Sequence, residues 1–573
     1  MTQLSSSDDG YYDLGAYSRP ITTASAAAQT WFTRGLIWSY GFHHEEATAC
    51  FENAISHDPT CAMAYWGLAY ALGPNYNKPW HFFSSSEINS TVTRTHRAVE
   101  QAKQHSSNTS AAEQGLISAL QHRYPGESGA ADYSIWNTSY ADAMRAVYAK
   151  HPHDHDIAAL TADALMNLTP WDLWDIHTGT PAPGAATLEI KSIFDAALSL
   201  PGGLSHPGLL HLYIHFMEMS PDPSVGLPIA NDLRGLVPDS GHLNHMPTHL
   251  DILCGDYSTA MIWNERATQA DEKYLRRSGP VNFYTLYRCH NYHFRIYAAM
   301  LAGNYSVAMH TVDALEASLP SDLLRTTNPA MADWLESFGS VRIHVLVRFG
   351  RWHDLIALRS PTDIDLYCVT TAFMHYGRAL AFAALNRIAE ADAEQSLFFT
   401  ATARVTSIGK DRTLFNNSAS ALLKIAQTML AGELAYRKAR FDDAFAHLRD
   451  AVRLDDTLPY DEPWGWMQPT RHAYGALLLE QGRVLEAETV YKADLGWDGD
   501  ASVPRQLRHE RNVWALAGLD ECFAKLGRSE RDKRKVRQLL DQVRREADVE
   551  VRVSCFCRTG TVIVGVPSQE AKF

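Results

Sequence analysis

A pattern of large and small residues recurs along this chain of 573 residues and limits the folds open to it. Its clearest copy consists of Trp31, Gly35, Trp38, Ala47, Phe51, Ala54 and Pro59. The small residues let two antiparallel helices approach closely, the large ones fill the space between them, and proline ends the unit. The pattern therefore predicts paired helices that cannot bury their apolar faces alone and must stack on neighbouring pairs.

Further copies follow at irregular intervals. A second unit runs from Met63 through Gly67 to Tyr70, and degenerate units begin at Gly255, Gly303, Gly350, Arg440, Gly482 and Trp514. Each Gly or Arg cluster marks a turn between paired helices, and the next Ala marks the start of the second helix. These second helices are marked by Ala260, Ala308, Ala444 and Ala487.

This pattern resembles the tetratricopeptide repeat (TPR), a helix pair of about 34 residues. The resemblance implies an all-α fold, an α-solenoid of antiparallel helix pairs made of degenerate repeats. We expect an N-terminal extension over 1–24, a single solenoid over 25–545 and a C-terminal tail over 546–573, with strand-like alternation only at 561–566. Aromatic loop inserts at 73–80, 169–184 and 460–466 either wall off a pocket or pack between irregular repeats.

Composition narrows the function classes. The net charge is −14 and no basic stripe is present, which argues against a nucleic-acid partner. No apolar run is long enough to span a bilayer, and the first ten residues lack the features of a secretory signal, so we expect a cytoplasmic location without membrane association. The eight cysteines include no C-x-x-C pair, which disfavours a cysteine zinc site or a disulfide framework.

Histidine is abundant, with 26 copies, and two stretches concentrate it. One carries His211, His215 and Glu218, and the other carries His242, His245 and His249. Residues at i, i+3, i+4 and i+7 share one face of a helix, so each stretch predicts three metal-ligand side chains on a helix face.

The repeat places the two stretches in matching positions. His211, His245 and His293 lie fifteen residues before Gly226, Ala260 and Ala308, and His215 and His249 lie eleven residues before the first two of these landmarks. The TPR resemblance implies that such positions line a concave groove, here at about 206–300. We therefore predict a metal between His211, His215, His245 and His249, with Glu218 as a ligand or proton acceptor. We predict that His242, His290 and His293 form a second layer around it or contact substrate, with Glu218, His242 and His293 as the catalytic candidates.

The expected metal is a divalent ion, with iron or copper favoured and zinc also compatible with imidazole-rich ligation. Leu212 stands where the H-E-x-x-H motif of zinc proteases has its general base, which argues against that class, and carboxylates are too few for a di-iron bundle. We predict a metal-dependent enzyme of oxidase or oxygenase type that acts on a small molecule. The expected substrate pocket consists of His44, Glu46, Asn75, Tyr76, Asp163, Trp171, Trp174, Tyr287, His290 and Asn291.

Glu46 also has a plain structural interpretation, because acidic residues at a helix N-terminus complement the helix dipole. Beyond the repeat, residues 25–545 resemble a bacterial and fungal group of TPR-domain proteins of unsettled function. The matching stretches are 42–47, 71–77, 164–175, 206–218, 241–249, 287–294 and 460–463. The group implies a fold and a set of motifs but no activity. Compared with peptide-binding TPR arrays, this chain has His where basic residues clamp a peptide carboxylate.

Two other functions stay open. One is a non-catalytic scaffold that binds a protein or peptide through the solenoid, which is also compatible with a homo-oligomer. The other is a metal-free cyclase or isomerase that uses His as acid and base near neutral pH. Nucleophilic catalysis is disfavoured, because the chain has no G-x-S-x-G, P-loop or dinucleotide-binding motif, and Cys254 and Cys289 are expected to pack as apolar residues.

Overall fold

The computed structural model describes residues 10–408, 411–497 and 503–558. The chain divides into two compact units, Met1–Leu250 with Arg266–Arg277, and Asp251–Glu265 with Ser278–Phe573. The division falls within helices α12 (Pro247–Leu253) and α13 (Tyr257–Ser278). The boundaries expected from the sequence, 1–24, 25–545 and 546–573, do not coincide with this division and stay a prediction.

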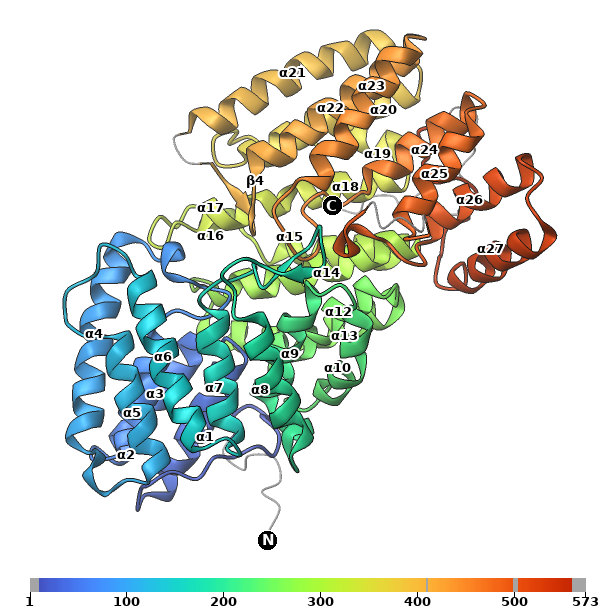
Figure 1. The fold of residues 1–573 in the computed structure, drawn as a ribbon. Helices are drawn as coiled ribbons and strands as arrows, with labels where there is room; N and C mark the ends of the chain where they lie inside the picture. Colours follow the sequence, from blue (N-terminus) through green and yellow to red (C-terminus); the bar gives the residue numbers. More distant parts are fainter. Residues whose placement is uncertain (1–9, 409–410, 498–502, 559–573) are drawn as a thin grey trace. The chain divides into compact units, whose positions relative to one another are not determined.

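The first unit is helical. Its α-helices are α1 (Ala26–Tyr40), α2 (His44–His57), α3 (Ala62–Leu72), α4 (Ser85–Gln104), α5 (Ala111–Arg123), α6 (Ser134–Lys150), α7 (His155–Met166), α8 (Thr187–Ser199), α9 (Pro207–Glu218), α10 (Leu227–Leu233), α11 (Gly241–His245) and α12 (Pro247–Leu253). From α1 to α9 each helix packs against the next, and α1, α3 and α5 also touch in order. Figure 1 shows the helices from α1 to α7 lying alongside one another.

One aromatic residue shows why the repeat pattern produces this packing. A Cβ added to Gly35 of α1 would lie 2.8 Å from the Phe51 ring of α2, and one added to Gly67 of α3 would lie 2.2 Å from it. Phe51 is 0% exposed between these two helices. Only glycine lets the flanking helices approach this ring so closely, and interiors are packed too densely to accept the extra atom without strain.

The second unit repeats this architecture. Its α-helices are α14 (Tyr284–Ala302), α15 (Tyr305–Ala317), α16 (Ser321–Leu324), α17 (Met331–Leu335), α18 (Val341–Arg348), α19 (Trp352–Ala357), α20 (Cys368–Ala384), α21 (Ile388–Ser407), α22 (Ala419–Arg437), α23 (Phe441–Asp456), α24 (Thr470–Glu480), α25 (Val484–Asp494), α26 (Val513–Lys525) and α27 (Glu530–Val543). From α18 to α27 each helix packs against the next. Tyr491 of α25 takes the place that Phe51 has in the first unit, because Gly475 and Gly518 approach its ring from α24 and α26.

The alanine landmarks from the sequence occupy equivalent places, whereas Gly226, from which His211 and His215 were counted, ends a 3-10 turn before α10. Ala47, Ala260, Ala308, Ala444 and Ala487 are each the fourth residue of their helix and each 0% exposed. Successive stacking of helix pairs through such small residues is the defining feature of a helical repeat. The predictions of an all-α α-solenoid fold and of TPR-like repeats are therefore confirmed.

Short connecting elements complete the description. Single turns of 3-10 helix are η1 (Trp80–Phe82), η2 (Ser106–Asn108), η3 (Gly203–Ser205), η4 (Pro223–Gly226), η5 (Glu336–Ser340) and η6 (Arg505–Leu507). Within the described residues the strands form two hairpins, β1 (Trp174–Asp175) with β2 (Thr180–Pro181) and β3 (Thr413–Leu414) with β4 (Asn417–Ser418). The alternation expected at 561–566 lies outside the described residues.

The expected extension and tail pack on helices where the structure describes them. Tyr11 donates a 2.6 Å hydrogen bond to Glu46, and Arg19 lies 2.6 Å from Asp156 of α7. Near the other end, Asp548 accepts a 2.6 Å hydrogen bond from the Tyr305 amide, and a disulfide joins Cys555 to Cys557. Among the described helices, none has a stretch that is both long and apolar enough to cross a membrane.

Candidate metal centre

Helix α9 carries the first histidine stretch. The imidazole of His206 accepts a hydrogen bond from the amide of Leu209, and Pro207 is the first helical residue, where its missing N–H is not needed. The helix ends at Glu218, and His211, His215 and Glu218 are 0–1% exposed. The predicted helix and the shared face of these side chains are both present.

The second stretch differs from the single helix expected. It forms two short helices, α11 and α12, interrupted at Met246. Pro247 accounts for this interruption because proline has no N–H to donate, while Met246 keeps helical backbone angles (φ −51°, ψ −40°). His242, His245 and His249 are nevertheless 0–3% exposed and face the α9 histidines.

Glu218 joins the two stretches. One of its oxygens accepts a 2.9 Å hydrogen bond from His215 Nδ1, and the other accepts a 2.8 Å hydrogen bond from His249 Nδ1. A carboxylate only accepts, so both histidines carry their proton on Nδ1 and leave a lone pair on Nε2. Metal-binding histidines usually donate their second nitrogen to a carboxylate or carbonyl in this way. This arrangement favours Glu218 as the group that orients two ligands; its expected part as a ligand stays untested.

His211 is held in the same protonation state by the backbone. Its Nδ1 donates a 2.5 Å hydrogen bond to the carbonyl of Tyr40, the last residue of α1. Its Nε2 lies 3.1 Å from Nε2 of His242. Two imidazole nitrogens bound to one metal at about 2.1 Å lie about 3.0–3.4 Å apart, so this separation fits a shared metal.

These nitrogens converge in one buried place. One ring nitrogen from each of His211, His215 and His242 lies within 4.8 Å of the other two. His245 Nε2 lies 2.7 Å from His249 Nε2, which places this pair beside Glu218. Nε2 of His215 is buried and has no hydrogen-bond partner among the described residues. A buried polar atom left in this state is destabilising unless a ligand takes it up. We call the five histidines and Glu218 the His cluster.

Burial keeps the imidazoles of His211 and His215 neutral, which is the form that binds metal. Burial lowers the pKa of His211 to about 3, an effect that the Tyr40 carbonyl opposes and His249 reinforces. Burial, together with His211, His249 and His245, lowers the pKa of His215 well below its usual range.

An aromatic ring from an unusual backbone position covers the cluster. Phe42 lies 4.5 Å from the His211 ring and stacks 5.6 Å from His215 and 5.7 Å from His242. Its φ is 53°, in the left-handed region, two residues before α2 begins. Gly255, Gly303, Gly350 and Gly482 occupy this turn position before α13, α15, α19 and α25, and Asn386 and Ala439 occupy it before α21 and α23, each with positive φ. A residue with a side chain is strained there by roughly 1–2 kcal/mol.

The predicted pocket residues of the first unit have varied environments. Tyr76 is 0% exposed, with its ring 5.1 Å from His215 and 5.7 Å from Trp171. Trp174 anchors its loop by donating a 2.8 Å hydrogen bond to the Phe216 carbonyl of α9. Asn75 shapes the loop by accepting 2.9 Å hydrogen bonds from the amides of residues 77 and 78. Tyr76 and Trp171 therefore adjoin the His cluster, and Asn75 and Trp174 support the loops that hold them.

The other pocket residues predicted in this unit are Glu46, Asp163 and His44. Glu46 accepts the hydroxyl of Tyr11, and burial raises its pKa. Asp163 of α7 accepts 2.9 Å hydrogen bonds from Tyr70 and Asn167. His44 has its ring 6.5 Å from Phe42, and burial lowers its pKa to about 4.

The remaining predicted residues, Tyr287, His290, Asn291 and His293, lie on α14 in the second unit. His293 is 1% exposed, and its ring lies 5.6 Å from Phe338 and 6.2 Å from Phe415. Burial lowers the pKa of His293 to about 3, reinforced by His344. Their expected place in one groove with His211 and His245 stays a prediction.

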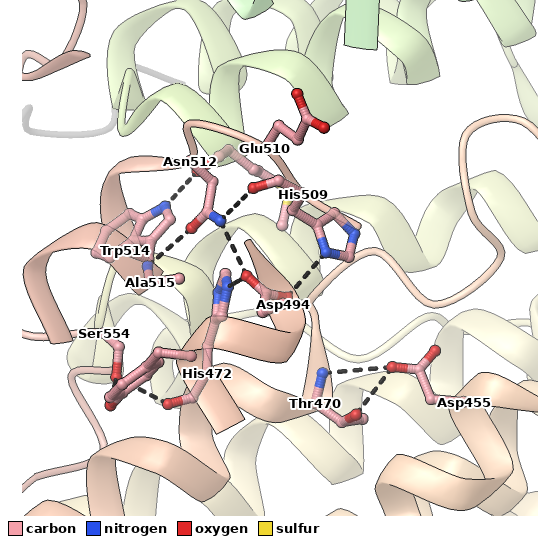
Figure 2. A network of polar contacts seen from close by, with 12 residues as sticks. Asp455, Thr470, His472, Asp494, His509, Glu510, Asn512, Trp514, Ala515 and Ser554 are labelled. Atoms are coloured by element: carbon pink, nitrogen blue, oxygen red, sulfur yellow. Dashed lines mark hydrogen bonds and ion pairs between the residues drawn. The ribbon is translucent and has the colours of Figure 1, made fainter. Parts of the chain in front are cut away.

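The second unit also shows what fully partnered buried histidines look like (Figure 2). Asp494 accepts 2.9 Å hydrogen bonds from His472 Nε2, His509 Nδ1 and the Asn512 amide. The remaining nitrogens are also engaged, since Arg348 lies 2.8 Å from His472 Nδ1 and Tyr297 lies 2.9 Å from His509 Nε2. This network leaves no imidazole nitrogen of His472 or His509 for a metal, in contrast to His215.

His242 was predicted in a second layer or at the substrate, and one of its ring nitrogens lies within 4.8 Å of nitrogens of His211 and His215, so its role stays a prediction. Sequence reasoning missed one contributor to the site. Phe42 was not expected to contact the site. Its signal was a bulky residue in a turn position that is Gly in four other units. That signal requires exact alignment of the degenerate repeats.

Comparisons with known proteins add little. No protein-family model and no curated protein matches the chain. The structure of Naa15/Naa10 bound to HypK-THB matches at 12% identity and a TM-score of 0.20, covering 90% of this chain and 70% of that one. The APC/C hetero-tetramer Cut9–Hcn1 matches at 11% identity and a TM-score of 0.23, covering 90% and 96%. The P58(IPK) TPR domain matches at 12% identity and a TM-score of 0.15, covering 76% and 98%. TM-scores this low carry no argument, so the assignment of helical repeats rests on the packing described above.

Proposed function

We propose that the first unit binds a divalent transition-metal ion through the His cluster and that the protein is a metal-dependent enzyme of redox type acting on a small molecule. The observation that carries this proposal is the protonation state imposed on three imidazoles. His211, His215 and His249 each donate Nδ1 to an oxygen, which leaves the lone pair of each on Nε2. Nε2 of His215 has no hydrogen-bond partner among the described residues, whereas Nε2 of His211 and of His249 lies 3.1 Å and 2.7 Å from Nε2 of a neighbouring histidine.

The donor set favours iron, copper or zinc, since imidazole suits all three. His211, His215 and His242 would hold the ion, with His245 and His249 beside them and Glu218 orienting the pair it bonds. The ion would supply Lewis-acid or electron-transfer chemistry when bound. The chain's own contribution is to fix the imidazole protonation states, exclude water by burial and cover the rings with Phe42 and Tyr76.

A metal-free acid–base enzyme is less consistent with these side chains. General acids and bases work best with a pKa near the working pH. The pKa of His211 is lowered to about 3, and that of His215 is also far below its usual range. Both imidazoles therefore stay neutral near pH 7 and are poorly suited to exchange protons there.

A scaffold that binds a protein or peptide is the second candidate. Helical repeats present extended surfaces suited to such partners, and this chain has that architecture in both units. The scaffold proposal does not account for the buried and unpartnered His215 Nε2.

Metal analysis separates the two candidates. Protein purified without a polyhistidine tag is dialysed and its metal content measured by mass spectrometry. We expect near-stoichiometric iron, copper or zinc in the unaltered protein and its loss in His215→Ala. The control His472→Ala removes a buried histidine of the second unit and should keep the metal. Metal-free protein that still cannot be loaded after exposure to these ions would refute the metal proposal.

A further inference from the structure

A buried arginine in the first unit has few polar partners. Arg123, the last residue of α5, is 1% exposed. Its Nη2 donates a 2.8 Å hydrogen bond to the Pro74 carbonyl, while Nε and Nη1 have no hydrogen-bond partner among the described residues. Burying a charged group without partners for its donors is strongly unfavourable. The unused N–H donors of Arg123 therefore favour a ligand that supplies acceptors.

Three aromatic rings surround this guanidinium. The centroid of the Tyr140 ring lies 4.8 Å from the Arg123 guanidinium carbon, that of Tyr70 lies 5.7 Å away, and that of Tyr124 lies 5.9 Å away. Cation–π contacts of this kind stabilise the charge through the ring face. The N–H groups of a guanidinium are the groups that recognise carboxylates.

Two hydroxyl groups in the same place also lack partners. The hydroxyls of Tyr124 and Tyr140 are buried and make no hydrogen bond within the described residues, and the two residues are 0% and 2% exposed. The nearby carboxylate of Asp163 is already engaged by Tyr70 and Asn167. The unused groups are therefore mostly donors, and a ligand that satisfies them must offer acceptors.

We propose that Arg123, Tyr124 and Tyr140 bind the carboxylate of a small organic acid. The planar donor edge of a guanidinium matches the two oxygens of a carboxylate. The buried carboxylate of Asp163 already acts on the charge of Arg123, so a bound anion adds negative charge to this place. A phosphate dianion adds about twice as much as a carboxylate, which favours the carboxylate.

The position of this subsite connects it with the His cluster. Pro74, which accepts the Arg123 hydrogen bond, lies two residues from Tyr76, whose ring is 5.1 Å from His215. The charge of Arg123 also acts on His44, whose ring lies 6.5 Å from Phe42, and the Phe42 ring lies 5.6 Å from His215. The assignment of the bound acid as the substrate rests on the proposed function, whereas carboxylate binding itself does not.

The test is calorimetric titration of metal-free protein with malonate, with benzoate and with inorganic phosphate, in each of several variants. Arg123→Gln should abolish carboxylate binding. Tyr124→Phe and Tyr140→Phe should each weaken it about tenfold, since a hydrogen bond to a charged group is lost. The control Tyr297→Phe removes a hydroxyl of the second unit that is partnered by His509 and should leave carboxylate affinity unchanged.

The unfolding temperature without ligand is a second readout. It would fall in the Tyr124 and Tyr140 variants if these hydroxyls served only to stabilise the fold. Tyr124→Phe and Tyr140→Phe remove hydroxyls that have no partner, so they should not lower the unfolding temperature, whereas Tyr297→Phe should lower it. The proposal is overturned if neither malonate nor benzoate binds, or if the three subsite variants bind them as tightly as the unaltered protein does. It is also overturned if phosphate binds more tightly than these carboxylates. Metal content is measured on each protein before its metal is removed for titration. Absence of metal together with intact carboxylate binding would count against the metal centre alone.

Discussion

Replacing Glu218 with Gln is a specific test of the candidate metal centre, because it changes one oxygen of a buried group to an amide nitrogen. The carboxylate accepts from His215 at 2.9 Å and from His249 at 2.8 Å. A Gln amide can accept only one of these bonds and must donate the other. The histidine that faces the amide N–H must then move its proton to Nε2, and its lone pair is lost to a metal.

The expected magnitude follows from that single change. Loss of a group that orients a metal-binding histidine weakens metal affinity by roughly 10–100-fold, or about 1.4–2.7 kcal/mol. The metal-free protein should also lose about 1.5–3 kcal/mol of stability, because a hydrogen bond to a buried charge is removed. Affinity is measured by competition with a chelator of known strength, and stability by urea unfolding.

Glu113→Gln is the matched control. Glu113 is a 3% exposed carboxylate of the same unit that accepts hydrogen bonds from Thr22 and from the Ser110 amide. It should lose stability but bind metal as the unaltered protein does. If Glu218→Gln and Glu113→Gln have equal and unaltered metal affinities, the proposed role of Glu218 is incorrect.

Three further predictions concern the fold and its dependence on pH. Gly67→Ala places a Cβ 2.2 Å from the Phe51 ring and should lower the free energy of unfolding by about 1–3 kcal/mol in urea melts, and an unchanged value would contradict the proposed helix contact. Asp494→Ala leaves His472, His509 and Asn512 without their shared acceptor and should cost roughly 3–5 kcal/mol, so a loss under about 1 kcal/mol would count against the network in Figure 2. The pKa of His211 is lowered to about 3 and that of His472 to about 4, so between these values and about 6.5 the unfolded chain binds protons that the folded chain does not. The stability of metal-free protein should therefore fall as pH falls below about 6.5, by up to about 1.4 kcal/mol per pH unit for each such histidine, and a flat profile from pH 7 to 5 would disprove the buried neutral state.

Much of the fold was predictable because the repeat pattern consists of large and small residues at fixed spacing. Gly35, Phe51 and Gly67 were chosen from spacing alone, and the structure brings these three into contact. The same holds for Ala47 and Ala487, which occupy equivalent buried positions in their helices. The two-unit division was not predictable, since nothing in the pattern marks the interior of α13 as a boundary.

The candidate site was predictable only in part. Helical spacing placed His211, His215 and Glu218 on one face, as the structure has them. The function of Glu218 as a bridge depends on how α9 and α12 approach, which spacing along one helix does not determine. One ring nitrogen of His242 lies within 4.8 Å of nitrogens of His211 and His215, a convergence that depends on how α9 and α11 approach and not on spacing along one helix. Arg123 gave no signal in the sequence, because an arginine at a helix C-terminus is ordinarily a surface residue that complements the helix dipole.

The most direct test of the central claim is anomalous X-ray diffraction from crystals of protein loaded with iron, copper or zinc, recorded at the absorption edge of the metal. We predict a strong anomalous peak among the Nε2 atoms of His211, His215 and His242, with Glu218 still accepting hydrogen bonds from Nδ1 of His215 and His249. A metal bound elsewhere in the chain, or a peak coordinated by Glu218 in place of these imidazoles, would contradict this prediction.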